Sequence, residues 1–343
     1  MKKNVFLPIA GMILGITVII VAYFAMNNGG FSQKDSQLSE NETTTETENT
    51  SEEKSQNSLG SKEKYYEWNG YVTEEDAVLD EKSVTRATNF FKKIQEDYLT
   101  GTNCTSYYAV IPDKNYYFPE ESGMSRMDYA GMYALLSQNM NEAKEIDLRK
   151  CLTLEDYYKT DTHWRQESLN LVAAQLVAQM ELERFAQDGG NIEYSKELVS
   201  DQYYGSYHPK SGLCSTPEDF YYLSSGAIES CEVYDYQNEK EIKMYSFESL
   251  EEDANLYDGF LGGALSLVTI ANPQVSNGKE LVIFRDSFGS SVAPLLTPYY
   301  EKITLVDIRY LSSRMLGNWI SFENQDVLFL YSTTVLNNSV TFK

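Results

Sequence analysis

The sequence predicts an α/β fold, in which the strands of a parallel sheet alternate with helices. Residues 281–284 form a continuous apolar run that is typical of a strand buried on both faces. The run stops at a polar turn, and residues 288–296 then have the apolar spacing of a helix. Strand-like and helix-like segments also alternate between residues 83 and 185. Such alternation is typical of a layered α/β domain.

The elements of the first half follow from this periodicity. Folding is predicted to begin near residue 65. Helical spacing covers residues 83–99, 128–141 and 166–185, and strand-like runs cover residues 107–111 and 145–148. A Pro-Asp-Lys turn ends the first of these strands.

The second half begins with a different pattern. Residues 191–256 are rich in tyrosine, with short strand-like runs and turn signals, and they predict β-hairpins inserted into the α/β body. After the helix at 288–296 we expect a strand at 303–306, a short helix at 311–315 and a last strand at 327–331.

The chain is strongly acidic. It has 343 residues, with 28 basic and 51 acidic side chains and a net charge of −23. Such a charge argues against nucleic acid or an anionic lipid surface as the main partner. Solubility outside the cell would also explain much of the acidity.

The amino-terminus predicts a membrane anchor. Residues 5–26 are almost entirely apolar and long enough to span a bilayer as a helix. Lys2 and Lys3 precede the span, which predicts that residues 1–4 stay cytoplasmic and the rest of the chain lies outside. A cleaved signal peptide is the alternative, although the residues around Tyr23 do not suit a cleavage site.

Residues 27–64 predict a tether. They are rich in Ser, Thr and Glu, and such a segment cannot bury enough apolar surface to offset its ordering entropy. We therefore expect a disordered acidic linker, with the extracytoplasmic domain covering residues 65–343.

Four cysteines follow the predicted anchor. An oxidising exterior would permit two disulfides, and four cysteines allow three connectivities. Cys214 and Cys231 bracket a short segment, so they are the first pair to expect, leaving Cys104 and Cys151.

Ser287 is the first candidate for chemistry. It lies in the turn between the strand at 281–284 and the following helix, at the carboxyl end of the predicted sheet, where α/β folds bind ligands. Free backbone N–H groups at a helix start favour developing negative charge. Asp286 and Ser287 are also preferred helix caps for purely structural reasons, so the position needs a partner elsewhere.

The chain has two histidines, and one of them has a nearby carboxylate. Asp161 precedes His163 by two positions, and in an extended segment such side chains lie on the same face. Asp161 would then hold the imidazole and leave its other nitrogen for a hydroxyl. His208 lies in a predicted turn. A half-buried structural histidine is the alternative for His163, and a zinc site would need His208 together with carboxylates.

Two stretches together resemble a known family. Residues 157–164 read Tyr-Tyr-Lys-Thr-Asp-Thr-His-Trp and resemble the signature of the DHHW family, with Thr162 departing from its second position. Residues 283–289 resemble the Gly-Asp-Ser-Phe block of the SGNH hydrolase superfamily, with Arg285 where glycine is usual. Residues 111–114 and 307–310 are also similar to family segments. DHHW proteins look like relatives of the alginate O-acetyltransferases, in which the Asp-x-His pair also precedes the serine.

The resemblance implies a fold and a set of roles. The fold is a three-layer α/β/α SGNH-like sandwich with a central parallel sheet. Ser287 would be the nucleophile, His163 the general base and then acid, and Asp161 the orienting carboxylate. With one other histidine and no paired-cysteine pattern, we expect no metal, and we expect no cofactor. Four further residues are candidates for oxyanion or substrate contacts: Asp286, Arg309, Tyr331 and Trp164; for Arg309 and Tyr331, an ion pair or a core position is an equal alternative.

The implied function is that of an extracytoplasmic O-acetyltransferase or acetylesterase acting on a cell-surface polysaccharide. A transferase would need a membrane protein that delivers acyl groups. A non-catalytic module for glycan binding or envelope assembly is the main alternative, because Arg285 departs from the pattern and the second oxyanion donor is not evident. A lipase is the third.

Overall fold

The computed structural model describes residues 60–62, 64–75, 78–182 and 192–343, all within one compact unit, residues 55–343. The predicted cytoplasmic end at 1–4, the anchor at 5–26 and nearly all of the linker at 27–64 lie outside the described residues. Within the described part of the chain, no helix has both the length and the apolar character needed to cross a membrane.

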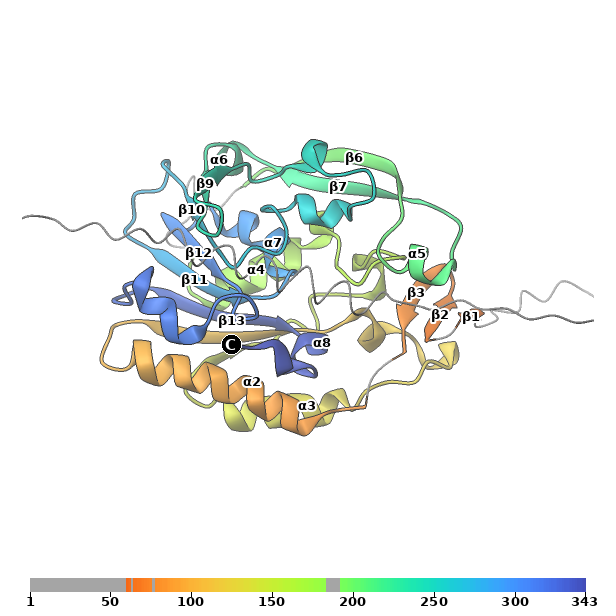
Figure 1. Cartoon of the computed structure of the whole chain (residues 1–343), viewed down its shortest axis with the longest axis horizontal. Coiled ribbons are helices and arrows are strands. Elements are labelled where there is room, and N and C mark those ends of the chain that lie inside the picture. The colour runs from red at the N-terminus through yellow and green to blue at the C-terminus, as the bar shows by residue number, and fades with distance from the viewer. Residues whose placement is uncertain (1–59, 63, 76–77, 183–191) are drawn as a thin grey trace, which may run out of the picture. The chain divides into compact units, whose positions relative to one another are not determined.

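A sheet of eight strands forms the centre of this unit (Figure 1), in the order β5-β4-β13-β11-β12-β10-β8-β9. Its first five strands are parallel, and the last three extend one edge in antiparallel pairing. The prediction of an α/β fold with a mostly parallel sheet is therefore confirmed. In sheet order the strands are β5 (Lys144–Ile146), β4 (Thr105–Ile111), β13 (Asp326–Ser332), β11 (Glu280–Arg285), β12 (Lys302–Val306), β10 (Leu267–Ala271), β8 (Glu232–Asp235) and β9 (Lys240–Ile242).

Apolar side chains cover both faces of the central strands. In β11, Leu281 and Ile283 pack into one core cluster, while Val282 and Phe284 pack into the other. This alternation follows from the two-residue repeat of a strand, and it explains why the sequence run is apolar without interruption.

Helices pack on both faces of the sheet (Figure 1). On one face lie α2 (Glu81–Ile94) and α3 (Tyr129–Asn139), whose buried side chains join the cluster of Val282 and Phe284. On the other lie α4 (Asn170–Gln179) and α7 (Gly289–Val292). The α2 helix begins where the Asp80 carboxylate accepts from the backbone N–H groups of Lys82 and Ser83.

Smaller elements surround this core. An antiparallel sheet contains β1 (Gly60–Lys62), β2 (Tyr65–Trp68) and β3 (Tyr71–Glu74), and an antiparallel pair contains β6 (Ser195–Tyr203) and β7 (Glu218–Ser224). Three short α-helices are α5 (His208–Ser211), α6 (Gly226–Glu229) and α8 (Thr333–Leu336). The π-helical turn is η1 (Gln95–Leu99), and the 3₁₀ turns are η2 (Lys114–Tyr117), η3 (Glu120–Ser122), η4 (Leu154–Asp156), η5 (Gln166–Ser168), η8 (Phe247–Ser249), η9 (Leu256–Gly259), η10 (Ala293–Leu296), η11 (Ser313–Asn318) and η12 (Ser339–Thr341).

Two helices are shorter than their periodicity predicts. The segment predicted at 166–185 contains η5 and then α4, which ends at Gln179. Glu181 has a φ of 57°, and a residue in the left-handed region cannot continue a right-handed helix. The segment at 288–296 divides into α7 and η10, with Pro294 near the start of η10. Strand β10 was not predicted.

The predicted disulfides are wrong. All four cysteines lie in the described part of the chain, and all four are free thiols. Cys214 belongs to a small cluster with Tyr65 and Val72, whereas Cys231 follows α6 and donates to Ala227 O. The short sequence separation of Cys214 and Cys231 therefore does not bring their sulfur atoms together.

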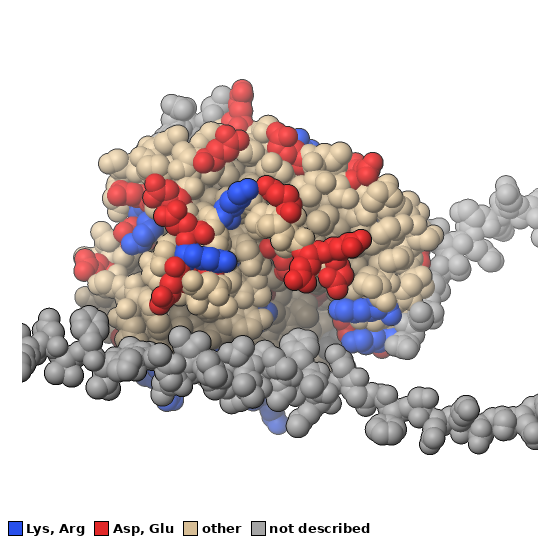
Figure 2. Space-filling view, turned by 45° about the horizontal axis from the view of Figure 1, so that its top comes forward, with Lys and Arg blue, Asp and Glu red and all other residues tan. Residues whose placement is uncertain are grey.

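The surface reflects the acidic composition. Figure 2 shows acidic side chains spread over the face turned toward the viewer, with fewer basic side chains between them. This distribution agrees with the net charge of −23.

Candidate active site

Two neighbouring parallel strands bring polar residues to one edge of the sheet. β11 ends at Arg285, directly before Asp286 and Ser287, and its neighbour β13 ends at Ser332. The Asp286 carboxylate accepts from Phe288 N at 3.1 Å and from Ser332 N at 2.7 Å. Asp286 therefore fixes the turn that carries Ser287 to the end of β13.

A hydrogen-bonded line runs from a carboxylate through an imidazole to a hydroxyl. Asp161 Oδ1 lies 2.6 Å from His163 Nδ1, and His163 Nε2 lies 2.7 Å from Ser287 Oγ. His163 and Ser287 are 124 positions apart in the chain. The structure thus brings these three predicted residues together, and we call them the Asp–His–Ser line.

A tight loop, residues 157–164, presents the first two members of this line. Tyr157 and Trp164 pair as an isolated antiparallel bridge, and Tyr158 N donates to His163 O at 3.1 Å. Asp161 Oδ1 also accepts from His163 N at 3.0 Å. A turn capped by the aspartate, rather than the expected extended segment, therefore places the carboxylate beside the ring.

The Asp161 carboxylate is fully buried and fully occupied. Its Oδ2 accepts from Ser206 N at 2.8 Å and from Asn255 Nδ2 at 2.7 Å. Burial raises the pKa of Asp161, but the His163 imidazole and the hydrogen bonds from Ser206 and His163 outweigh it and hold that pKa below its usual range. Asp161 is therefore ionised in neutral solution.

This charge state fixes the direction of the hydrogen bonds. An ionised carboxylate only accepts, so His163 Nδ1 carries the proton that lies toward Asp161. In a neutral imidazole the other nitrogen then has a free lone pair. His163 Nε2 accepts from the Ser287 hydroxyl, which is the arrangement that a base needs to take the hydroxyl proton.

Aromatic rings hold the imidazole in place. The Tyr257 ring stacks on His163 with centroids 3.7 Å apart and planes at 9°, and Phe288 contacts the imidazole at 4.8 Å. Behind them, Ser291 Oγ accepts from Trp164 Nε1 at 2.8 Å and lies 2.7 Å from Tyr257 Oη. This packing restricts rotation of the ring, because the His163 side chain is only 12% exposed.

One backbone donor is free beside the serine hydroxyl. Among the described residues, Ser287 N–H finds no hydrogen-bond acceptor. A free N–H on the same residue as the hydroxyl can stabilise negative charge on an oxygen bound there. The Asn255 amide donates one of its hydrogens to Asp161.

Arg285 lies under the turn rather than in the solvent. Its guanidinium is fully buried and reaches the carbonyl oxygens of Gly263 at 3.4 Å and Leu265 at 3.3 Å. A Cβ added to Gly289 would lie 2.7 Å from Arg285 Cβ, so the glycine leaves room for the arginine. Burial lowers the pKa of Arg285.

Among the described residues, none of the remaining candidates has a side chain hydrogen-bonded to the Ser287 hydroxyl. Arg309 pairs with Asp307 at 2.6 Å. Tyr331 is buried in the core against Phe91, so both residues take the structural alternative that the sequence left open. Trp164 and Asp286 support the site through the contacts described above. His208 lies apart from the line, with Nδ1 3.0 Å from Leu213 O.

Sequence reasoning missed several supporting residues. Asn255 accepts from Tyr257 N at the start of η9, so its sequence signal is that of a helix cap. Ser206 contacts Asp161 through its backbone, which no side-chain pattern reveals. Tyr257 is one of 27 tyrosines and stands in no recognisable motif.

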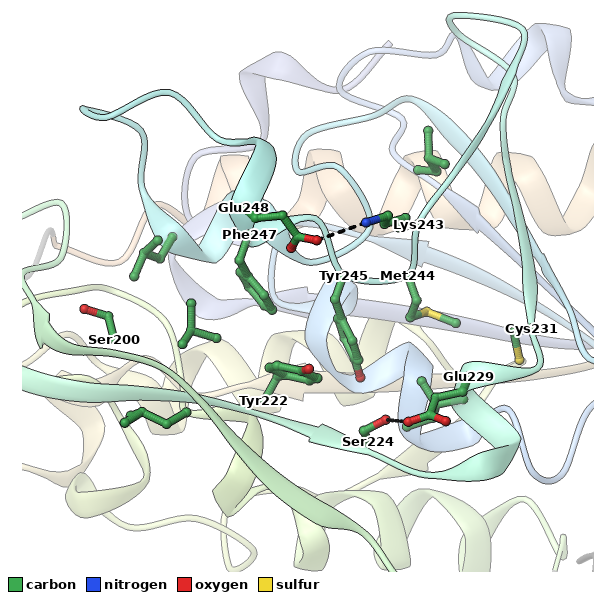
Figure 3. Close-up of a pocket in the computed structure, with 15 residues that line it drawn as sticks. Ser200, Tyr222, Ser224, Glu229, Cys231, Lys243, Met244, Tyr245, Phe247 and Glu248 are labelled. Carbon is green, nitrogen blue, oxygen red and sulfur yellow. Dashed lines mark hydrogen bonds and ion pairs between the residues drawn. The ribbon is translucent and has the colours of Figure 1, made fainter.

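A separate cavity of about 910 Å³ lies between the β6–β7 pair and residues 242–248 (Figure 3). Tyr222, Tyr245 and Phe247 form aromatic parts of its wall, and two exposed glutamates, Glu229 and Glu248, also line it. The carboxylate of Glu248 is paired with the Lys243 ammonium at 3.0 Å. No member of the Asp–His–Ser line is among its lining residues, so it is distinct from the candidate active site.

The model of the DHHW protein family matches residues 110–306, a range that includes the whole Asp–His–Ser line. No curated protein matches the sequence.

Several solved structures share the fold. A DHHW family protein from Eubacterium siraeum DSM 15702 is 18% identical, with a TM-score of 0.62, covering 79% of this chain and 91% of its own. PatB1 from Bacillus cereus, in a structure with a sulfonyl adduct, is 16% identical with a TM-score of 0.62, covering 81% of this chain and 97% of its own. A second PatB1 structure is 16% identical with a TM-score of 0.60, covering 81% and 96%.

Proposed function

The chain belongs to the DHHW protein family, and we propose that it is an O-acetyltransferase or acetylesterase that uses a serine nucleophile and acts on a cell-surface polysaccharide outside the cytoplasm. The single observation that carries the proposal is the 2.7 Å contact between His163 Nε2 and Ser287 Oγ. A purely structural histidine and a helix-capping serine have no reason to meet across 124 positions of sequence.

The first half of the reaction makes an acyl-enzyme. His163 Nε2 takes the Ser287 proton as Oγ attacks the carbonyl carbon of an acetyl ester. The negative charge that forms on the carbonyl oxygen is stabilised by Ser287 N–H. The intermediate collapses as the bond to the donor oxygen breaks, and that oxygen receives the proton from His163. Asp161 stays ionised and stabilises the imidazolium throughout.

The second half transfers the acetyl group. His163 takes a proton from a sugar hydroxyl or from water, whose oxygen attacks the acetyl-serine carbonyl. The Ser287–acyl bond then breaks, and His163 returns the proton to Ser287 Oγ. A sugar hydroxyl gives transfer, and water gives hydrolysis.

The substrate and location are assigned by resemblance and by the sequence. The anchor at 5–26 and the linker at 27–64 would hold the domain near the outer side of a membrane, within reach of a long polymer. A membrane protein that hands over acyl groups would supply the donor for a transferase.

We also propose that the fold is an SGNH-type three-layer α/β/α sandwich. Helices on both faces of a mostly parallel sheet, with the serine soon after a central strand, support an SGNH-type three-layer sandwich. The PatB1 structure with a sulfonyl adduct supports the choice of a sulfonyl reagent for this chain.

Turnover of a chromogenic acetyl ester tests the proposal. We expect Ser287→Ala and His163→Ala each to lower kcat by at least about 10³-fold, because members of such a triad act as one unit. His208→Ala removes the other histidine and is the matched control; it should leave turnover unchanged.

The non-catalytic alternative has a different outcome. Arg285 in place of glycine is the observation that favours it. If the wild-type domain binds glycan without any turnover, and Ser287→Ala leaves this binding unchanged, the protein is a binding module.

A further inference from the structure

A buried lysine lies behind the loop that carries Asp161 and His163. Lys114 begins η2, and its side chain is 2% exposed. Its Nζ donates to the carbonyl oxygens of Tyr158 at 3.0 Å and Lys159 at 3.1 Å. Among the described residues no carboxylate forms an ion pair with it. Burying an ammonium without such a partner costs free energy, so these two contacts need an explanation.

The backbone at Lys114 is anchored to the sheet through the neighbouring Asp113. Lys114 follows Asp113 just beyond the carboxyl end of β4, and the Asp113 carboxylate accepts from Tyr129 Oη at 2.7 Å and from Thr333 Oγ1 at 2.6 Å. Thr333 follows β13 directly. The ammonium therefore extends from the same edge of the sheet that carries Ser287.

The two carbonyl groups belong to the stem of the loop. Tyr158 N donates to His163 O at 3.1 Å, so the Tyr158 peptide lies directly beside the His163 peptide. Lys159 O also accepts from Val72 N at 2.7 Å, but Lys114 Nζ is the one donor to Tyr158 O among the described residues. Without Lys114, the Tyr158 carbonyl would be buried without a partner.

We propose that Lys114 is a positioning residue, which holds the 157–164 loop in the position that allows His163 Nε2 to contact Ser287 Oγ. The inference rests on the proposed function for its effect on turnover, and on geometry alone for its effect on the loop. The Tyr207 ring, 5.0 Å from Nζ, covers the ammonium, and Tyr207 N holds the loop through Thr160 O at 2.9 Å. Loop, ring and ammonium thus form one packed unit.

Two variants separate hydrogen bonding from packing. Lys114→Met keeps an unbranched side chain of nearly the same length and removes every donor, whereas Lys114→Gln keeps an uncharged donor. We expect Lys114→Met to lower kcat by about 10²-fold with KM within about twofold, because a displacement of about 1 Å has that effect on a reacting pair. Lys114→Gln should recover at least about fivefold of this loss. Lys150→Met, at an exposed site, should match wild type.

A second readout does not depend on turnover. The proton on His163 Nδ1 lies in a 2.6 Å contact with Asp161 and should give a far-downfield proton NMR signal that His163→Ala lacks. In folded Lys114→Met, with folding checked by thermal unfolding, we expect this signal to disappear through exchange with solvent. If Lys114→Met does not fold, Lys114→Gln serves instead, with a broadened signal expected.

The outcomes distinguish the two proposals. Wild-type kcat and an unchanged downfield signal in a folded Lys114 variant would overturn the positioning role. A wild-type protein that shows the signal but no ester turnover would overturn the proposed function and leave the positioning role standing.

Discussion

Asp161 is held more completely than the two groups it supports. It accepts four hydrogen bonds: from the backbone N and the ring Nδ1 of His163, from Ser206 N and from Asn255 Nδ2. A buried carboxylate with all its partners in place cannot rotate away from the ring, and it does not take up a proton in neutral solution. Asp161 therefore fixes the imidazole through Nδ1, and only Nε2 is free to react.

The burial of Lys114 predicts a pH dependence of stability. Burial lowers the pKa of Lys114 from 10.5 to about 7, against the opposing charges of Asp161, Glu218, Cys214 and Asp113. Between these two pKa values the unfolded chain binds a proton that the folded chain does not, so the free energy of unfolding rises with pH. The stability gained from the deprotonation of Lys114 is complete above about pH 10.5, and it is lost as the pH falls to about 7.

Chemical denaturation of wild type and Lys114→Gln between pH 7 and 8.5 tests whether the free energy of unfolding depends on the Lys114 proton. The difference in the free energy of unfolding should move in favour of wild type by up to about 1.4 kcal/mol per pH unit. Burial raises the pKa of the Cys214 thiol, so this neighbour of Lys114 stays protonated in both folded proteins over the range. A difference that stays flat over this range would mean that Lys114 does not titrate there.

The sequence predicts the reacting residues better than the residues that hold them in place. Ser287, His163 and Asp161 could be proposed because the chain has only two histidines and one of them follows an aspartate by two positions. Asn255 could not, because an asparagine before a short helix has the same pattern when it only caps that helix. The Ser206 contact uses a backbone N–H, which every residue except proline has.

Among the elements, the segment 205–207 matters most to the site. Gly205 N donates to Thr160 Oγ1 at 2.8 Å, Ser206 N to Asp161, and Tyr207 N to Thr160 O. Three successive backbone groups therefore hold the 157–164 loop from outside. The close approach needs a residue without a side chain, since a Cβ on Gly205 would lie 2.3 Å from Asp161 Cβ.

Gly205→Ala is therefore expected to displace the loop. The overlap should lower the free energy of unfolding by about 1–3 kcal/mol, and kcat should fall because His163 moves away from Ser287. Gly226→Ala is the matched control, since a Cβ there meets no atom within 4 Å. Ester turnover and thermal unfolding measure both effects; equal behaviour of the two variants would show that the 205–207 segment does not position the loop.

Strand positions could be predicted where burial on both faces leaves an unbroken apolar run, as in β11 and β13. β10 is also apolar, but it was not predicted from the sequence. Helix ends were predicted less well, because the break at Glu181 depends on a backbone conformation that composition does not reveal.

For the molecule as a whole, the topology explains why distant residues meet. β4, β13 and β11 are parallel neighbours, so their carboxyl ends lie along one edge of the sheet. Lys114 comes soon after β4, Thr333 after β13 and Ser287 after β11. The alternating pattern predicts this edge as the place for a site. It does not predict which loop crosses over it, because that depends on long-range packing.

Covalent labelling tests whether Ser287 is a nucleophile that His163 activates. The intact domain is treated with phenylmethylsulfonyl fluoride and analysed by mass spectrometry with peptide mapping. Attack by Ser287 Oγ forms the sulfonate ester, fluoride leaves, and His163 takes the proton. We predict one adduct per chain, on Ser287, formed at least about 10²-fold more slowly in His163→Ala. An unmodified Ser287 would show that this serine is not a nucleophile. Labelling at the same rate in His163→Ala would show that His163 does not activate it.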